Sequence, residues 1–446
     1  MSNEKKQWGA IIVMIALFAM IAFVTNLCSP MAVIVKNQFG ASNLQAQIGN
    51  YGNFIAYLLM GIPAGMLLKK VGYKRTALIA LIVGIVGIFV QWMSGWESMR
   101  GAAFAVYLVG AFIGGLCMCM LNTVVNPMLN ILGGGGNRGN QLIQIGGVFN
   151  SAAAVAVYII MGALIADATK ATVSDATPAL FIAGGIFIIA FVVILFTKID
   201  EPEQADLKKI EEKEHAKKLA PGQKDKYSAF SFRHFKLGIL AIFLYMGIEV
   251  GVPTYILQYL TAAQDAVTPG LGMDAGIVGL IVAVYWLMML VGRFVGGAIG
   301  SKVSSKQMIT VASTAAIVLI LFGMFAPQTW LVNIPGVDWA KLEMIWAEVP
   351  VGIFAFILVG LCTSVMWGGI FNMAVEGLGK YTAIASGAFM TMVFGCAVMV
   401  AIQAWVADFS CNYLISYFVP LGCAVYILYY ALIGSKNVNT DIPVAD

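Results

Sequence analysis

The segment Leu237–Leu260, LGILAIFLYMGIEVGVPTYILQYL, is long and apolar enough to cross a bilayer as one helix, and the interpretation of the whole chain starts from it. It carries a single acid, Glu249, near its centre, and Pro253 follows four residues later. A charge at that depth costs roughly 2.5–3.5 kcal/mol or more to insert, and such acids tend to line substrate or ion pathways. Pro253 lacks an N–H and leaves the carbonyl of Glu249 free at the same level. We therefore predict that Glu249 faces a polar cavity, which the rest of the chain encloses.

The composition is that of a polytopic helical membrane protein. The chain has 446 residues, of which 60% are apolar and 11% are charged, and its mean hydropathy is +0.88. So few charges cannot solvate the surface of a soluble globule. We predict an all-α membrane fold of twelve spans, at Trp8–Val35, Leu44–Leu68, Thr76–Trp96, Ala102–Leu132, Gln141–Ala166, Pro178–Thr197, Leu237–Leu260, Ala275–Gly300, Gln307–Ala326, Val351–Val375, Tyr381–Ala407 and Asn412–Ile433.

The distribution of lysine and arginine predicts the orientation. If the N-terminus is cytoplasmic, 22 of the 26 basic residues lie on that side, and only Lys36, Arg100, Lys170 and Lys341 lie outside. Both termini are then cytoplasmic. The net charge of +4 reflects loops that face an anionic leaflet, so no nucleic-acid partner is needed to explain it. Short outer loops without an Asn-x-Ser/Thr sequon favour a bacterial inner membrane.

A charged segment divides the spans into two groups of six. Residues Lys198–Lys236 are rich in Lys and Glu and predict a cytoplasmic linker, with a short surface helix around Leu207–Lys218. We predict one six-helix bundle at 1–197 and a second at 237–446. The two histidines, His215 and His234, fall in the linker, so we expect no histidine in the membrane to relay protons.

Short matches in register indicate that the halves repeat one another. The matched stretches follow spans two and eight, end spans four and ten, and close spans five and eleven. The matched pairs are Gly65 with Gly297, Lys70 with Lys302, Lys74 with Lys306, Asn126 with Asn372, Gly133 with Gly379 and Asp167 with Asp408.

Spans one and seven form a further matched pair. Asn26-x-x-x-Pro30 corresponds to Glu249-x-x-x-Pro253, so each helix has a polar side chain whose own carbonyl is freed by a proline. Two such breaks that face each other are typical of a binding site at a repeat interface. The alternative is that both prolines only bend their helices for packing.

Motifs in both halves match one known family. They are GIPAGMLLKKVGYK at Gly61–Lys74, LNTVVNP at Leu121–Pro127, FNS at Phe149–Ser151, YMGIE at Tyr245–Glu249 and EGLG at Glu376–Gly379. With these motifs the sequence resembles the major facilitator superfamily, and within it the fucose–galactose–glucose symporter branch of fucose permease-like sugar transporters. The resemblance implies two pseudo-symmetric six-helix bundles. It also implies import of a neutral monosaccharide, such as glucose, galactose or fucose, by cation-coupled alternating access.

The chain departs from that branch at two acids. Fucose permease-like proteins carry one acid in span one and another in span four, both tied to proton coupling and sugar binding. The corresponding positions here are Ser29 and Asn122, which cannot exchange a proton. The acid has in effect moved to Glu249, as in relatives that resemble glucose/galactose carriers.

Three roles for Glu249 therefore remain open. Burial disfavours its charged form, so it could bind a proton and release it as the cavity hydrates, which gives symport. Its carboxylate, the freed carbonyls and Ser29 could instead hold Na⁺. It could also only accept hydroxyls of the sugar, in a uniporter. Apart from H⁺ or Na⁺ as coupling ion, we expect no cofactor and no bound metal.

The spans provide the groups that a neutral sugar needs, which are amides for its hydroxyls and flat aromatic rings for its apolar faces. Asn122, Asn126 and Asn130 recur every four residues and form one stripe. For each asparagine the alternative is a contact between helices, and for each tryptophan it is core or lipid packing. The candidate sugar contacts are Asn26, Asn122, Asn126, Asn150, Glu249, Trp286, Trp367 and Asn372.

Basic residues near the inner ends of spans predict a gate. Arg293 lies about 10 Å from the inner end of its span and Glu249 about 18 Å from that of its own, so we expect no tight pair between them. We expect the loops Lys69–Arg75 and Lys302–Lys306 to latch the outward-open form. The candidate gating residues are Lys70, Arg75, Arg293 and Lys302.

Two other classes of protein share some of these features. A drug or metabolite antiporter of the same fold is the first, but a lining with many amides and few acids suits sugars better than lipophilic cations. A membrane-bound enzyme or receptor is the second, and neither a nucleophile–histidine pair nor a metal cluster supports it. We expect a monomer in the lipid bilayer that acts on a monosaccharide and is not an enzyme.

Overall fold

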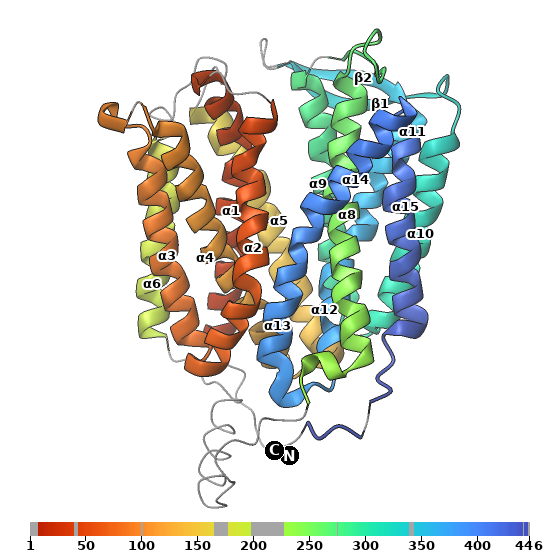
Figure 1. The fold of residues 1–446 in the computed structure, drawn as a ribbon. Coiled ribbons are helices and arrows are strands. Elements are labelled where there is room, and N and C mark those ends of the chain that lie inside the picture. Colours follow the sequence, from red (N-terminus) through yellow and green to blue (C-terminus); the bar gives the residue numbers. More distant parts are fainter. Residues whose placement is uncertain are drawn as a thin grey trace, which may run out of the picture.

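The computed structural model describes residues 8–39, 43–99, 101–164, 177–197, 227–273, 275–338, 343–439 and 441–444. Long helices run side by side from one end of the molecule to the other, and a two-stranded hairpin lies at one of these ends (Figure 1). Within the described residues, eleven spans are long and apolar enough to cross a membrane, and α5 (Gly136–Leu164) runs alongside them. The chain therefore crosses twelve times, as predicted. The helix expected around Leu207–Lys218, and His215, lie outside the described residues.

The first half of the chain supplies six crossings, with one short 3-10 turn. Their bounds are α1 (Trp8–Phe39), α2 (Asn43–Val71), α3 (Tyr73–Met93), η1 (Glu97–Met99), α4 (Ala103–Leu132), α5 (Gly136–Leu164) and α6 (Thr177–Phe196). We call the end of the molecule where α6 ends the linker side and the opposite end the hairpin side.

The second half crosses six times with more interruptions. Its helices are η2 (Ala229–Ser231), α8 (Arg233–Thr261), α9 (Ala275–Ile299), α10 (Ser305–Phe325), α11 (Val351–Thr363), α12 (Met366–Val375), η3 (Gly379–Tyr381), α13 (Thr382–Thr391), η4 (Met392–Phe394), α14 (Gly395–Ser410), η5 (Ile415–Tyr417), α15 (Phe418–Tyr429) and η6 (Tyr430–Gly434). The pair α11 and α12 forms one crossing, the run from α13 to α14 forms another, and the run from η5 to η6 forms the last.

The start of α8 corrects one expectation. The helix begins at Arg233, so one further turn precedes the predicted span at Leu237 on the linker side. His234 therefore lies within the helix and is fully buried, with Nε2 3.0 Å from the carbonyl oxygen of Glu376. The expectation that both histidines fall in the linker is wrong for His234.

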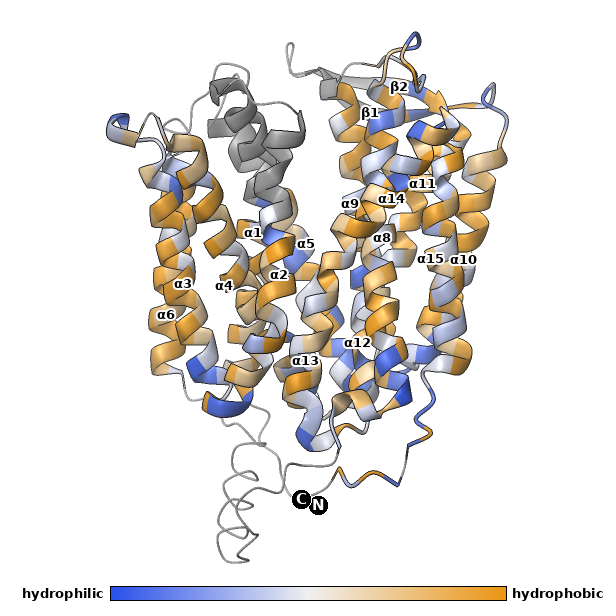
Figure 2. Ribbon diagram, viewed as in Figure 1, coloured by the Kyte–Doolittle hydropathy of each residue, from blue (hydrophilic) through white to orange (hydrophobic). Residues whose placement is uncertain are grey.

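The outer surface of the bundle is apolar. Side chains such as Ile189 on α6 and Val311 on α10 are 65% and 70% exposed. Figure 2 shows hydrophobic residues along α3 and α6, whereas hydrophilic residues gather at the ends and around α5 and α12. Apolar side chains outside and polar ones between the halves are the arrangement that a lipid environment requires.

The hairpin on the hairpin side is an element that sequence reasoning missed. Strands β1 (Leu331–Asp338) and β2 (Glu343–Pro350) pair antiparallel, with Val332 opposite Val349. Apolar side chains alternate in the way a half-buried strand requires, since Val349 is fully buried and Trp346 is 65% exposed. The segment is too short and too polar to register in a search for spans.

The two halves pack together on the linker side. On α2, Gly61 and Gly65 lie against Gly387 of α13, so closely that an added Cβ on Gly387 would contact the carbonyl oxygen of Gly61 and lie 2.8 Å from Cα of Gly65. We call this contact the glycine seam. A second contact joins α5 to α9, where Gln141 Nε2 donates to the carbonyl oxygen of Gly297 at 3.0 Å. Both contacts lie in the half of the bundle next to the linker.

The internal repeat is visible in two helix caps. Lys74 Nζ donates to the carbonyl oxygens of Leu195 and Thr197, at 3.0 and 2.8 Å, at the end of α6. Its repeat partner Lys306 donates to the carbonyl oxygen of Leu432 at 3.0 Å, at the end of the last crossing. Each lysine thus closes the C-terminus of the sixth crossing of its own half.

Replacing either lysine should lower stability by a small amount. A cation at a helix C-terminus contributes about 0.3–1 kcal/mol, so we expect Lys74→Met and Lys306→Met each to lower the midpoint of thermal unfolding in detergent by a few degrees at most. Lys236→Met, at an exposed lysine near the N-terminus of α8, is the control, because no helix C-terminus lies there. Equal shifts for all three variants would contradict the capping role.

Candidate binding site between the halves

Glu249 and Arg293 form an ion pair inside the bundle. Arg293 Nη2 lies 3.5 Å from Glu249 Oε1, and the two side chains are 10% and 13% exposed. We expected no tight pair between them, and the structure nevertheless brings them within ion-pair distance, although the pair is loose. The chain runs in opposite directions in α8 and α9, and helical side chains lean towards the N-terminus of their helix, so these two lean towards each other. Their lengths then cover the remaining difference in depth.

The guanidinium of Arg293 also binds the other half of the protein. Arg293 Nη1 donates to the carbonyl oxygen of Gly147 at 3.2 Å, to Asn150 Oδ1 at 3.1 Å and to Ser151 Oγ at 2.8 Å, all on α5. These are hydrogen bonds, whereas 3.5 Å to the carboxylate is longer than a normal one. Arg293 thus holds α5 closely and Glu249 loosely.

Asn150 is a predicted candidate that contacts Arg293, and Ser151 is a second contact of Arg293 that the sequence analysis missed. Asn150 Nδ2 donates to the carbonyl oxygen of Phe18 at 2.9 Å, so its amide joins α1, α5 and Arg293. Ser151 stood in the sequence only as part of the motif at 149–151. A small hydroxyl next to a candidate asparagine was the available signal.

The asparagines of α4 face three different partners. Asn122 Nδ2 donates to the hydroxyl of Tyr57 on α2 at 2.7 Å. Asn126 Oδ1 accepts a hydrogen bond from Trp367 Nε1 at 3.1 Å, and Asn130 Nδ2 donates to Asn372 Oδ1 at 2.7 Å. The second and third contacts join the two halves. The predicted stripe is therefore present on one helix.

One aromatic candidate, Trp367, contacts residues of this region, and the other, Trp286, shares a helix face with Arg293. Trp367 on α12 is half-buried, and its ring lies 6.1 Å from that of Tyr245 and 5.6 Å from that of Phe389, between centroids. Trp286 lies seven residues before Arg293, and hence on the same face of α9. Its ring stands perpendicular to Tyr285 at 5.5 Å.

For the remaining candidates the described residues show no contact with this cluster. Asn26 Nδ2 donates to the carbonyl oxygen of Ala22 at 2.8 Å, within its own helix. The side chain of Ser29 lies outside the described residues. Lys70, Arg75 and Lys302 are exposed on the linker side, and their gating role stays a prediction.

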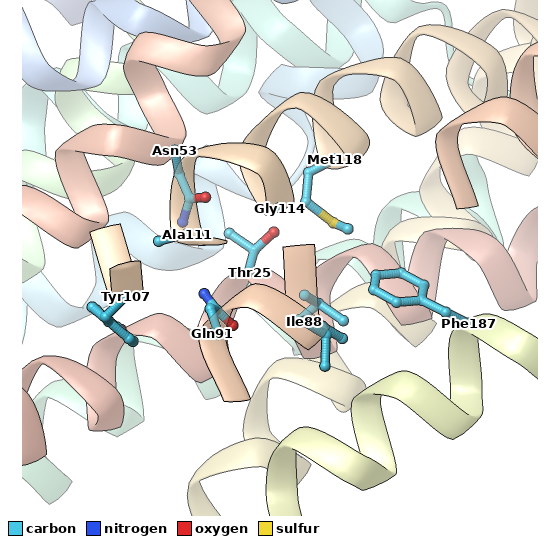
Figure 3. Close-up of a pocket in the computed structure, with 10 residues that line it drawn as sticks. Thr25, Asn53, Ile88, Gln91, Tyr107, Ala111, Gly114, Met118 and Phe187 are labelled. Atoms are coloured by element: carbon cyan, nitrogen blue, oxygen red, sulfur yellow. The ribbon is translucent and has the colours of Figure 1, made fainter. Parts of the chain in front are cut away.

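A small cavity lies within the N-terminal half instead of between the halves. It has a volume of about 20 Å³ between α1, α2, α3, α4 and α6, and Figure 3 shows the side chains of Thr25, Asn53 and Gln91 around it. The buried hydroxyl of Thr25 has no hydrogen-bond partner among the described residues. The volume is enough for one water molecule, whereas small-molecule sites measure about 300–1,000 Å³. This cavity is therefore not a sugar site.

Comparison with known proteins shows similarity to one family of transporters along nearly the whole chain. The family model of the Major Facilitator Superfamily matches residues 13–432. The chain is 27% identical to a glucose/galactose transporter of Brucella abortus (strain 9-941) over 441 residues, which cover 98% of this chain and 96% of that protein. It is 22% identical to the L-fucose-proton symporter of Escherichia coli K12, with 95% and 92% covered.

The fold is similar to that of a solved transporter. The crystal structure of FucP, a transporter of the Major Facilitator Superfamily, in the outward conformation superimposes with a TM-score of 0.74 at 21% identity, over 96% of this chain and 99% of that one. This likeness supports the twelve-crossing arrangement in two six-helix bundles.

Proposed function

This chain belongs to the major facilitator superfamily, and we propose that it is a secondary active transporter that imports a neutral hexose, such as glucose, galactose or fucose, with a proton by alternating access. It is a multi-pass membrane protein and not an enzyme. The similarity to glucose/galactose transporters and to an L-fucose-proton symporter supports the sugar and the proton. The positive-inside rule supports a cytoplasmic linker side, and a bacterial inner membrane and a monomer remain part of the proposal.

One observation carries the proposal, which is the buried pair of Glu249 and Arg293 between the halves. The two charges cancel, so the pair gives this region no net charge that would attract an ionic substrate. Asn150 bonds to Arg293, and Trp367, whose ring lies 6.1 Å from that of Tyr245 on α8, donates to Asn126. Such groups suit hydroxyls and the apolar face of a sugar ring better than a lipophilic cation, which disfavours the drug antiporter.

The position of Arg293 favours H⁺ over Na⁺ as the coupling ion. A Na⁺ ion on the Glu249 carboxylate would lie about 4 Å from the guanidinium, and two like charges at that distance repel by about 4 kcal/mol at an effective dielectric constant of 20. A proton neutralises the carboxylate and adds no cation beside the arginine. A uniporter would need Glu249 only as an acceptor for sugar hydroxyls, and accumulation under a proton gradient separates that role from symport.

The bonds of Arg293 suggest how proton and conformation are coupled. With the linker side closed, the three oxygens on α5 satisfy the guanidinium, so Glu249 can take up a proton. When the linker side opens, α9 moves away from α5 and Arg293 loses those acceptors. A buried arginine that has lost its hydrogen-bond acceptors needs a counter-charge, so it then pairs with ionised Glu249, which releases its proton to that side. The proton thus moves in the same direction as the sugar.

Uptake into proteoliposomes tests this function. We expect labelled hexoses to accumulate when the outside is made acidic, and not to accumulate under a Na⁺ gradient at equal pH. Labelled N-acetylhexosamines test the breadth of the substrate class in the same vesicles. Accumulation driven by Na⁺ alone would replace the ion, equilibration without accumulation would show a uniporter, and failure with every sugar would contradict the proposal.

Loss of the indole N–H of Trp367 should weaken sugar transport. Trp367→Phe removes the hydrogen bond to Asn126 and part of the flat surface, and we expect KM for the sugar to rise about tenfold, because a buried polar group left unpaired costs roughly 1–3 kcal/mol. Trp405→Phe, at a 64% exposed tryptophan on α14, is the control and should keep the wild-type KM. An unchanged KM for Trp367→Phe would remove this residue from the site.

A further inference from the structure

Tyr245 presents a buried hydroxyl that no described residue satisfies. The side chain lies on α8, one helical turn before Glu249, and is fully buried. Its hydroxyl lies beside the Glu249 carboxylate but reaches full hydrogen-bonding geometry neither with it nor with any other described residue. Buried hydroxyls nearly always have a partner in native proteins, so an unpaired one next to a carboxylate needs an explanation.

The neighbourhood of Glu249 leaves Tyr245 as the available partner. In the part of the chain that the structure describes, four titratable or charged side chains interact electrostatically with the carboxylate, namely Arg293, Tyr285, Cys396 and Tyr245. Arg293 is engaged by α5, and the hydroxyl of Tyr285 lies 3.2 Å from Thr363 Oγ1. A thiol is a weak donor. The phenol of Tyr245 is the one strong neutral donor without another partner.

We propose that Tyr245 is a positioning residue for proton coupling, whose hydroxyl becomes the hydrogen-bond partner of Glu249 when Arg293 gives up its loose contact with that carboxylate and keeps only its bonds to α5. This inference rests on the proposed proton symport and deepens it. A phenol donates to an ionised carboxylate and accepts from a protonated one, so it can hold Glu249 in one position in both states. When the linker side opens and Arg293 turns to Glu249, the phenol is no longer needed.

The packing of the ring ties this arrangement to the sugar site. The ring of Tyr245 lies 6.1 Å from that of Trp367, whose indole donates to Asn126 of the other half. A sugar that stacks on Trp367 therefore lies one ring away from the phenol. Tyr245 thus connects the proposed stacking surface to the proposed proton site through two adjoining side chains.

The variant Tyr245→Phe tests the proposal, with the pH dependence of sugar uptake as the readout. Loss of a donor to the carboxylate favours its protonated form, so we expect the pH at which uptake falls to half to rise by about one unit, with KM changed less than threefold. Tyr430→Phe is the matched control, because that hydroxyl is also buried and unpartnered but lies against Gly238, away from Glu249. Its pH profile should remain that of the wild type.

Each possible result of these measurements supports or overturns the proposed role of Tyr245. A wild-type profile for Tyr245→Phe overturns the inference and leaves proton symport intact. A rise in KM without a shifted profile shows that the hydroxyl binds sugar instead, which also overturns it. If the wild-type protein itself ignores pH and a pH gradient, the proposed function fails, and the inference fails with it. Where Tyr245→Phe is too unstable to purify, the same profile is measured in intact cells.

Discussion

Glu249→Gln is expected to abolish accumulation of sugar while leaving exchange of labelled for unlabelled sugar across the membrane. The amide is close to the carboxyl group in shape but cannot release a proton, so it resembles the protonated state permanently. Arg293 keeps its three acceptors on α5 in the closed state. When the linker side opens without sugar, Arg293 loses these acceptors and finds no ionised carboxylate to pair with. The empty carrier therefore cannot complete the conformational change that exposes the site to the other side again.

Two uptake measurements separate these effects. In proteoliposomes under an inward proton gradient, the accumulation ratio of Glu249→Gln should fall to about one, and counterflow should stay within about threefold of the wild type. Glu348→Gln, at an exposed acid on β2, is the control for loss of a carboxylate. A variant that still concentrates sugar normally would show that Glu249 is not the coupling residue.

Gly387→Val is expected to prevent closure of the linker side. Its side chain would enter the glycine seam, where a Cβ already contacts the carbonyl oxygen of Gly61 and lies 2.8 Å from Gly65. The obstacles are backbone atoms, which cannot turn away. Overpacking of this kind costs about 3 kcal/mol, enough to shift the equilibrium between the two conformations about 100-fold and to lower uptake by a similar factor.

Labelling of a buried cysteine shows the conformation directly. Asn140 is fully buried near the linker end of α5, so Asn140→Cys should react slowly with a maleimide supplied from the linker side and rapidly when Gly387→Val is added. Gly422→Val on α15 is the matched control, because an added Cβ there meets nothing within 4 Å. Wild-type uptake and slow labelling in Gly387→Val would show that the seam does not close the gate.

Much of the fold was predictable because a membrane restricts the secondary structures that a crossing segment can adopt. A segment such as Thr177–Phe196 has no polar group that could pair its backbone in lipid except through its own helix, so length and hydropathy determine the crossing. The hairpin Leu331–Pro350 lies outside that constraint. Its strands depend on pairing with each other and on burial of Val349, which a search for spans does not measure.

The amino-acid sequence was enough to predict the twelve crossings, the repeat seen in Lys74 and Lys306, and Glu249 as the acid of interest. The partner of that acid became evident only from the packing of the helices. Distances along each helix separated Glu249 from Arg293 in depth, whereas antiparallel helices whose side chains lean towards their own N-termini bring the two together. The hold of α5 on Arg293 and the unpaired hydroxyl of Tyr245 depend on contacts between helices distant in the chain, and such contacts exist only after folding.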